Sequence, residues 1–244
     1  MRHRLLAVVL LAFACAGQTT DSTDDRVYRV LFIGNSLTAT NDLPHTVAAL
    51  GVTVHDIITV EAVTRPNLAI IDHVNGASNA VDMIRQGRWD YVVLQQGPTS
   101  QQIGRDTLIL ATKLLNPDIR AAGAQTAELM VWPASSSLST FDGVLQSCLE
   151  AAGAVDGLCL PAGQAWRAAW AVDPTLPLYG PDGFHPSELG TYLAALVVYE
   201  GITGHSATAL PTQAYANGHT IDAPVNTIQL LQRVAHETVL SYRR

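Results

Sequence analysis

Two short polar segments of this 244-residue sequence carry residue types that can perform acyl transfer. The first is Gly34-Asn35-Ser36, which offers a serine hydroxyl after a small residue. The second is Asp182-Gly183-Phe184-His185, in which a carboxylate and an imidazole stand three residues apart. A histidine can take the proton of a serine while an aspartate orients its ring. Ser36, His185 and Asp182 therefore predict nucleophilic catalysis at a carbonyl carbon.

Both segments also have a purely structural interpretation. Ser36 can cap a helix that follows a tight turn. Asp182 and Gly183 can form a turn in front of a helix capped by Ser187. The structural interpretation of the second segment accounts for Asp182, Gly183 and Ser187, but it leaves His185 unexplained.

A third polar segment, 95–100 (QQGPTS), follows an apolar run. An acyl-transfer site needs hydrogen-bond donors aimed at the developing oxyanion. The side chains of Gln95 and Gln96 and the N–H of Gly97 are candidates for that role. The alternative is a polar loop without a catalytic role.

The elements that must position these segments alternate between apolar strands and helical stretches. Strands are predicted at 27–34, within 52–63, and at 90–95, 128–132 and 155–160. Helices are predicted at 42–50, 77–86, 106–122, 138–152, 165–171, 187–202 and 226–241. This alternation predicts an α/β protein with a three-layer, doubly wound, flavodoxin-like fold around a five-stranded parallel sheet. Its site is expected beyond the carboxyl ends of the strands.

Composition excludes several classes of protein. Hydrophobic residues make up 48% of the chain, which excludes a disordered chain. Fourteen Lys and Arg face 21 Asp and Glu, a net charge of −7, which argues against nucleic-acid partners. The first strand is followed by neither of the glycine-rich phosphate-binding motifs, G-x-G-x-x-G and G-x-x-x-x-G-K-[ST]. No group of His or Cys residues has the spacing of metal ligands. We therefore expect no cofactor and no metal.

The first 15 residues have the pattern of a secretory signal peptide. A short basic start, with Arg2 and Arg4, precedes an apolar run from Leu5 to Cys15. The alternative is a buried N-terminal element. The segment also resembles a bacterial lipoprotein signal, so membrane attachment through a lipidated Cys15 is a second possibility. We expect export to the periplasm, cell surface or medium, a linker at 16–26 and one catalytic domain at 27–244.

Two further cysteines, Cys148 and Cys159, lie in the expected domain. In an oxidising compartment they can form a disulfide. The alternative is a pair of buried free thiols, and export favours the disulfide.

Together, the first two segments resemble the first and last blocks of the SGNH (GDSL-type) hydrolase superfamily. Those blocks are Gly-Asp/Asn-Ser after the first strand and Asp-x-x-His before the final helices. The run from Leu178 to Tyr199 looks especially like secreted bacterial members. The resemblance implies that Ser36 is the nucleophile, His185 the general base and Asp182 its orienting partner. It also implies that the Ser36 N–H is one oxyanion donor.

The middle blocks depart from the family pattern. The second block normally supplies a glycine N–H to the oxyanion hole, but residues 64–68 (TRPNL) contain no glycine. The N–H of Arg65 is expected to take that place. The third block normally supplies an asparagine, which is absent here, so Gln95, Gln96 and Gly97 are the candidate substitutes.

Four other residues have weaker claims on a role in the site. His73 is expected to be structural. Trp132, at the end of the predicted fourth strand, is the tryptophan best placed to line the site. Glu128 and Asp173 have no visible acid/base partner, so a two-carboxylate glycosidase is not expected.

These expectations define a serine esterase that acts on a small-molecule or glycan ester. The family and the expected location favour removal of acetyl groups from a carbohydrate or a cell-wall glycan. A lipase, a thioesterase or an acyltransferase with the same triad is an alternative. A noncatalytic surface binding protein is another, motivated by the altered middle blocks.

Overall fold

The computed structural model describes residues 26–243. The predicted signal peptide, Cys15 and all but the last residue of the predicted linker lie outside these residues. In the described part, five strands form one parallel sheet in the order β2-β1-β3-β4-β5. The strands are β1 (Val27–Gly34), β2 (Ile57–Thr64), β3 (Tyr91–Leu94), β4 (Gln125–Leu129) and β5 (Leu158–Leu160). The predicted doubly wound fold is therefore confirmed.

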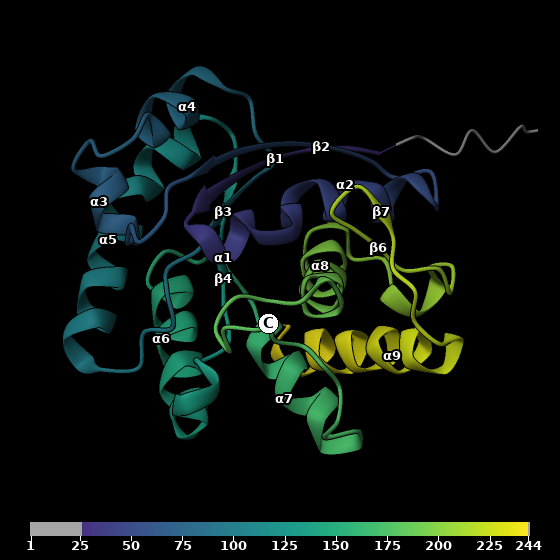
Figure 1. Cartoon of the computed structure of the whole chain (residues 1–244). Coiled ribbons are helices and arrows are strands. Elements are labelled where there is room, and N and C mark those ends of the chain that lie inside the picture. The colour runs from purple at the N-terminus through teal and green to yellow at the C-terminus, as the bar shows by residue number, and fades with distance from the viewer. Residues whose placement is uncertain (1–25, 244) are drawn as a thin grey trace, which may run out of the picture.

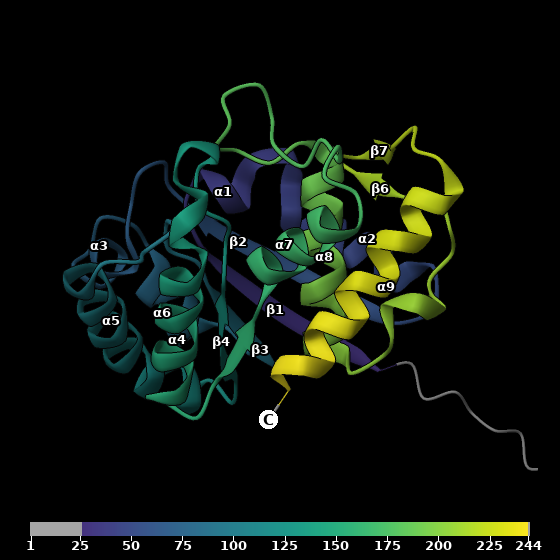
Figure 2. The same ribbon diagram turned by 90° about the horizontal axis from the view of Figure 1, so that it is seen from below.

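Helices cover both faces of the sheet, as Figures 1 and 2 show. One face carries α3 (Ile70–Val74), α4 (Ala80–Gln86), α5 (Gln102–Ala121) and α6 (Phe141–Gly153). The other carries α2 (Leu43–Val52), α7 (Ala162–Val172), α8 (Glu188–Thr203) and α9 (Val225–Tyr242). The short α1 (Ser36–Ala39) follows β1, and a small hairpin of β6 (Tyr215–Ala216) and β7 (His219–Thr220) precedes α9. Within residues 26–243, short 3₁₀ turns lie at Thr40–Asp42, Ser135–Thr140 and Ala207–Ala209.

β1 lies between β2 and β3 in the sheet and is buried on both faces. Leu31, Phe32 and Ile33 have no exposed surface. Successive side chains of a strand point to opposite faces. Phe32 accordingly packs in the core beneath α2 and α8, while Leu31 and Ile33 pack beneath α3, α4 and α5.

The connections after β1 and β3 leave on opposite faces of the sheet. The chain passes from β1 to α2 on one face and from β3 to α5 on the other. The crevice of a doubly wound sheet opens where the winding direction reverses, at the carboxyl ends of two such strands. Ser36 follows β1, and the segment 95–100 follows β3, so both lie at this crevice.

Two local features differ from the sequence-based expectation. β4 begins at Gln125 and ends at Leu129, so Trp132 lies beyond the strand and not within it. The short helices α1 and α3 were not predicted, because four or five residues are too few to show a helical period.

Cys148 on α6 and Cys159 on β5 are joined by a disulfide, with their Cα atoms 5.9 Å apart. The bond links α6 to the edge strand of the sheet. No helix within residues 26–243 combines the length and the apolar character needed to cross a bilayer.

Candidate active site

Ser36, His185 and Asp182 are connected by two hydrogen bonds. The Oγ atom of Ser36 lies 2.8 Å from Nε2 of His185. The Nδ1 atom of the same ring lies 2.6 Å from Oδ2 of Asp182. The serine and the carboxylate thus contact opposite nitrogens of one imidazole, across 149 residues of sequence.

The turn after β1 presents Ser36 at the start of α1. Asn35 is the N-cap of this helix, and its Oδ1 accepts a hydrogen bond from the N–H of Leu37 at 3.1 Å. The Nδ2 of Asn35 donates to the carbonyl of Leu68 at 3.1 Å. Asn35 therefore fixes the nucleophile turn and ties it to the loop after β2.

Gln95 supports the nucleophile turn from below through its side-chain oxygen, while its Nε2 has no hydrogen-bond partner among the described residues. Its side-chain Oε1 accepts from the N–H of Asn35 at 3.0 Å and from Oγ1 of Thr38 at 2.8 Å. Gln95 is only 1% exposed and does not line the pocket beside Ser36. Gly34 is required above it, because a Cβ there would lie 2.6 Å from the same oxygen.

His73 is a second support of this turn. It is fully buried, its Nε2 lies 3.1 Å from the carbonyl of Gly34, and its Nδ1 lies 2.7 Å from Oγ of Ser78. Burial lowers the pKa of His73 below its ordinary value. A neutral imidazole that donates to Gly34 and accepts from Ser78 satisfies both contacts.

Asp182 is held by its own loop. Besides the contact with His185, its carboxylate accepts hydrogen bonds from the backbone N–H groups of Phe184 at 3.0 Å and His185 at 2.9 Å. The side-chain hydrogen bond to His185, followed by these two backbone bonds, lowers the pKa of Asp182 to about 2. The carboxylate is therefore ionised throughout the neutral range and keeps the imidazole proton on Nδ1.

Arg65 does not contribute its N–H to the site, so the expectation for this residue was wrong. The ladder between β1 and β2 extends one residue further than expected, and the N–H of Arg65 donates to the carbonyl of Gly34 at 3.0 Å. A bonded N–H in the sheet is not available to an oxyanion.

Asn67, which the sequence analysis did not single out, follows Arg65 by two residues in the loop after β2. Asn67 lines the pocket beside Ser36 and has a φ of +63°. Within residues 26–243, no atom accepts a hydrogen bond from the N–H of Asn67 or of Ser36. Asparagine is among the few residues other than glycine that adopt this conformation readily. The asparagine at this position was therefore the sequence feature that could have indicated a turn with positive φ here.

Gln96 and Gly97 line the pocket beside Ser36. The Oε1 of Gln96 accepts from the N–H of Ile70 at 3.2 Å, and its Nε2 donates to Oγ1 of Thr99 at 2.9 Å. One amide hydrogen of Gln96 therefore remains for a ligand. The N–H of Gly97 has no acceptor among the described residues.

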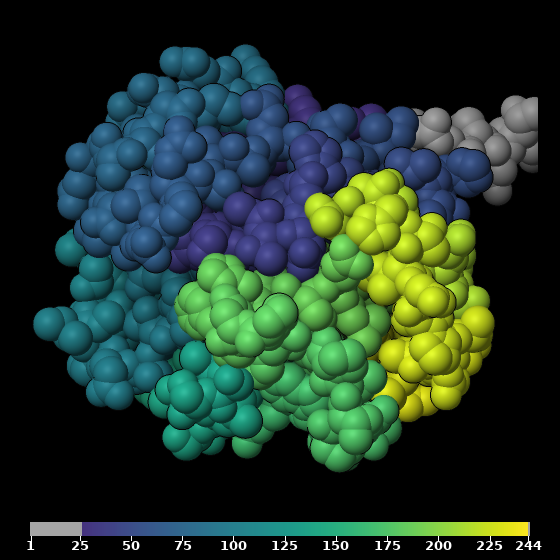
Figure 3. All heavy atoms as spheres, viewed as in Figure 1, coloured from purple at the N-terminus to yellow at the C-terminus, as the bar shows by residue number. Residues whose placement is uncertain are grey.

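The pocket beside Ser36 is an open depression of about 390 Å³. Figure 3 shows its neighbourhood, where the purple segment of α1 lies between the blue segment after β2 and the green segment before α8. Its lining combines apolar and polar residues from four segments: Asn35, Ser36, Asn67, Leu68, Ala69, Gln96, Gly97, Pro98, Thr99 and Phe184.

Trp132 does not line this pocket, contrary to expectation. It is 1% exposed and stacks on Trp166, with ring centroids 3.6 Å apart and an interplanar angle of 5°. Its indole N–H donates to the carbonyl of Phe184 at 3.0 Å. The chain after β4 turns inward, so Trp132 supports the loop that carries His185 from beneath.

Glu128 is a buried carboxyl group without an ionic partner among the described residues. Oγ1 of Thr112 donates to it at 2.6 Å. Burial raises the pKa of Glu128 to about 8, and the hydrogen bond from Thr112 opposes this only in part. A cavity of about 20 Å³ lies between Glu128 and the loop that contains Gln96 and Gly97.

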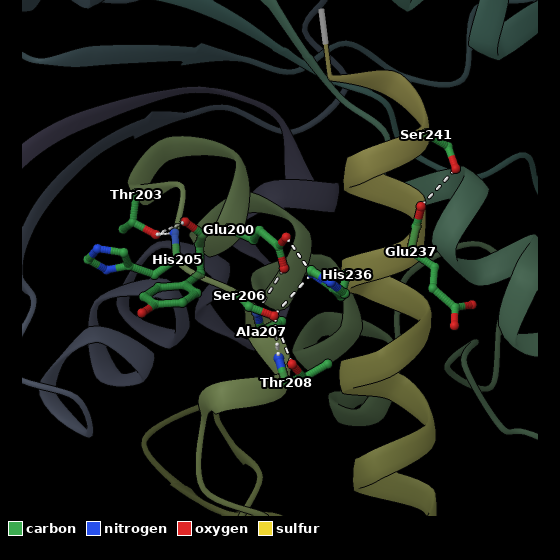
Figure 4. Close-up of polar contacts among 10 residues, drawn as sticks. Glu200, Thr203, His205, Ser206, Ala207, Thr208, His236, Glu237 and Ser241 are labelled. Atoms are coloured by element: carbon green, nitrogen blue, oxygen red, sulfur yellow. Dashed lines mark hydrogen bonds and ion pairs between the residues drawn. The ribbon is translucent and has the colours of Figure 1, made fainter.

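A second group of a serine, a histidine and a carboxylate lies between α8 and α9 (Figure 4). Ser206 Oγ and Glu200 Oε1 both contact Nδ1 of His236, at 3.0 and 2.8 Å. A catalytic relay needs the serine and the carboxylate on different ring nitrogens, so this group is structural. Across residues 26–243, no three His, Cys, Asp or Glu side chains are grouped as metal ligands.

Comparison with solved structures identifies several similar folds. A DUF4886 family protein from Bacteroides uniformis has a TM-score of 0.74 and 18% identity, over 88% of this chain and 95% of that one. A proposed SGNH hydrolase from Slackia heliotrinireducens has a TM-score of 0.60 and 26% identity, over 72% and 100%. The psychrotrophic esterase EstA from Pseudoalteromonas has a TM-score of 0.55 and 14% identity, over 72% and 97%. No protein-family model and no curated protein matches the chain.

The structural neighbours include SGNH and GDSL-type hydrolases, so the resemblance expected from the sequence is confirmed. The five-stranded parallel sheet with helices on both faces is the fold of that superfamily. The chain is therefore similar in fold to these hydrolases.

Proposed function

We propose that this protein is a serine esterase. In this proposal Ser36 is the nucleophile, His185 is the general base and then the general acid, and Asp182 orients the imidazole. The observation that carries the proposal is the unbroken pair of hydrogen bonds, 2.8 Å from Ser36 to His185 and 2.6 Å from His185 to Asp182. This is the arrangement that activates a serine hydroxyl at neutral pH.

In the acylation step, Oγ of Ser36 attacks the ester carbonyl carbon while its proton moves to Nε2 of His185. The carbonyl oxygen becomes an oxyanion, and collapse of this intermediate breaks the bond to the alcohol. The departing alcohol takes the proton from His185. Water then attacks the acyl-enzyme in the same way and restores Ser36. Asp182, ionised because its pKa is about 2, stabilises the imidazolium formed in each half-reaction.

The oxyanion donors that we propose are the backbone N–H groups of Ser36 and Asn67, with a third donor from Gly97 or Gln96. The first two N–H groups belong to residues that line the same pocket and have no acceptor within residues 26–243. Preorganised backbone donors of this kind cost no reorganisation during the reaction.

For the substrate, we propose a short acyl ester of a polar alcohol, in particular an acetylated carbohydrate or cell-wall glycan. The open pocket of about 390 Å³ supports a small acyl group beside Leu68 and Phe184. Asn67, Gln96 and Thr99 place amide and hydroxyl groups at the same pocket, where they can bond to the hydroxyl groups of a sugar.

We also propose that the protein is exported. The signal-like pattern of residues 1–15 motivates this proposal, and the bond between Cys148 and Cys159 supports it, because disulfides persist in oxidising compartments. Attachment to a membrane through a lipidated Cys15 is a further possibility of the same proposal.

The function is tested by hydrolysis of 4-nitrophenyl esters from acetate to octanoate by the chain without residues 1–15. We expect acetate to be the best substrate and Ser36→Ala to lower kcat by at least about 10³-fold. Ser136→Ala, at an exposed serine outside the pocket, is the matched control.

Other results would favour the alternatives. Fastest turnover of octanoate would favour a lipase or thioesterase, and transfer of the acyl group to an added sugar would favour an acyltransferase. The absence of Ser36-dependent turnover by folded protein would favour a noncatalytic binding protein.

A further inference from the structure

The short segment that carries His185 is held on both sides by side-chain N–H groups from other parts of the chain. The indole N–H of Trp132 donates to the carbonyl of Phe184 at 3.0 Å. The Nδ2–H of Asn41 donates to the carbonyl of Pro186 at 2.9 Å. These carbonyl groups belong to the two residues that flank His185.

Trp132 belongs to a rigid platform beneath this segment. Its ring is stacked on Trp166, and the following residues are bonded to the same loop. The hydroxyl of Tyr179 donates to the carbonyl of Pro133, and the N–H of Ser135 donates to the carbonyl of Gly183 at 2.8 Å. Gly183 has a φ of +68°, and a side chain there would collide with Ser135. The chain after β4 is thus docked closely on the loop.

Asn41 approaches the segment from the nucleophile's side. It lies five residues after Ser36, and both Asn41 and Asp42 have positive φ, at 54° and 52°. Asparagine and aspartate are among the residues other than glycine that adopt this conformation most readily. Here the conformation directs the Asn41 amide to Pro186 and also, at 3.0 Å, to Oγ1 of Thr191 on α8.

We propose that Trp132 and Asn41 are positioning residues that together set the place of His185 relative to Ser36. The proposal rests on the proposed esterase function. The side chains of Asp182 and His185 are 52% and 32% exposed, so burial alone does not fix them. The two side-chain hydrogen bonds to the flanking carbonyls hold the backbone instead, together with a bond from the N–H of Gly180 to the carbonyl of His185 at 2.8 Å. A displacement of about 1 Å in a catalytic group can cost 10²-fold in rate.

The test compares Trp132→Phe and Asn41→Gly with a matched control. The first variant removes the indole N–H but keeps an aromatic ring, and the second removes the amide but tolerates the positive φ. The control is Trp89→Phe, because Trp89 is 7% exposed and also donates its indole N–H to a carbonyl, that of Met83 at 3.0 Å. Trp89 packs in the core cluster that does not contain Trp132.

We expect both positioning variants to lower kcat for 4-nitrophenyl acetate by 10- to 100-fold, with KM changed less than about twofold. The control should leave both constants unchanged, although it loses a hydrogen bond of the same kind. In wild-type protein, the proton on Nδ1 of His185 should give a downfield NMR resonance that shifts or broadens in the two positioning variants only.

Unchanged kcat and an unmoved resonance in both variants would overturn the proposal, as would an equal loss of kcat in Trp89→Phe. Wild-type protein that does not turn over esters would instead refute the proposed function. The resonance of His185 would then still decide whether Trp132 and Asn41 hold this residue.

Discussion

Replacing Glu128 with glutamine should remove a destabilisation that grows as the pH rises. Burial raises the pKa of this carboxyl group from 4.5 to about 8, so the folded protein keeps it protonated at neutral pH. In the unfolded chain the same group ionises near its ordinary pKa. Between these two values the folded state binds the extra proton, and stability therefore falls with rising pH.

The magnitude follows from the size of the shift. Each pH unit between the two pKa values costs about 1.4 kcal/mol, so the full loss at pH 8 is roughly 5 kcal/mol. Glu128→Gln does not ionise and escapes this loss. The glutamine amide has two N–H donors where the protonated carboxyl group has one O–H, and burying the extra donor destabilises the folded state by an amount that does not depend on pH. The pH slope of the stability difference is therefore the diagnostic quantity.

The assay is urea unfolding of both proteins at pH 5, 6, 7 and 8. We expect Glu128→Gln to gain stability relative to wild type by about 1 kcal/mol per pH unit across this range. Glu237→Gln, at an exposed carboxylate on α9, should show no such slope. A stability difference between Glu128→Gln and wild type that is the same at all four pH values would refute the reasoning.

Three further outcomes are expected. Asp182→Asn should lower kcat on the order of 10³- to 10⁴-fold, because the imidazole then loses the carboxylate that keeps its proton on Nδ1. In the wild-type protein, Asp182 has a pKa of about 2 and should therefore produce no acid limb in the pH–rate profile above pH 4. Replacing Cys148 and Cys159 together with serine should lower the free energy of unfolding by about 3 kcal/mol for their 11-residue separation, and a loss below 0.5 kcal/mol in urea titrations would contradict this. Asn67→Gly keeps a backbone N–H at positive φ, so kcat within threefold of wild type supports the backbone donor, whereas a hundredfold loss assigns the donor to the side chain.

The sheet and the two outer motifs could be predicted from sequence because their signals are local. The apolar β-rich run of β1 and the alternation of strands and helices were enough for the fold. Asp182 and His185 are three residues apart, and that spacing lets the carboxylate bond the ring and two backbone N–H groups of its own loop. Ser36 comes directly after β1, at the carboxyl ends of the strands, where side chains are accessible to a substrate.

The oxyanion side could not be predicted because it depends on the direction of individual N–H groups. Whether the N–H of Arg65 faces the site or the sheet depends on where the ladder between β1 and β2 ends, and strand ends are poorly marked in sequence. The role of Gln95 beneath Asn35 and Thr38 depends on hydrogen bonds to residues 60 and 57 positions away in the sequence.

The place of Trp132 was missed for a related reason. Its expected exposure assumed that the fourth strand continued to this residue. The strand ends at Leu129, and the stack with Trp166, 34 positions later, then determines where the ring lies. The residues next to Trp132 in the sequence give no indication of its contact with Trp166.

The central claim is that Ser36 is an activated nucleophile, and covalent trapping tests it most directly. Folded protein is treated with a 4-nitrophenyl alkylphosphonate, and the modified residue is located by peptide mass spectrometry. We expect one adduct, on Ser36, which is absent in Ser36→Ala and forms at least about 10²-fold more slowly in His185→Ala. An unmodified Ser36, or an adduct that forms at the same rate without His185, would contradict the account.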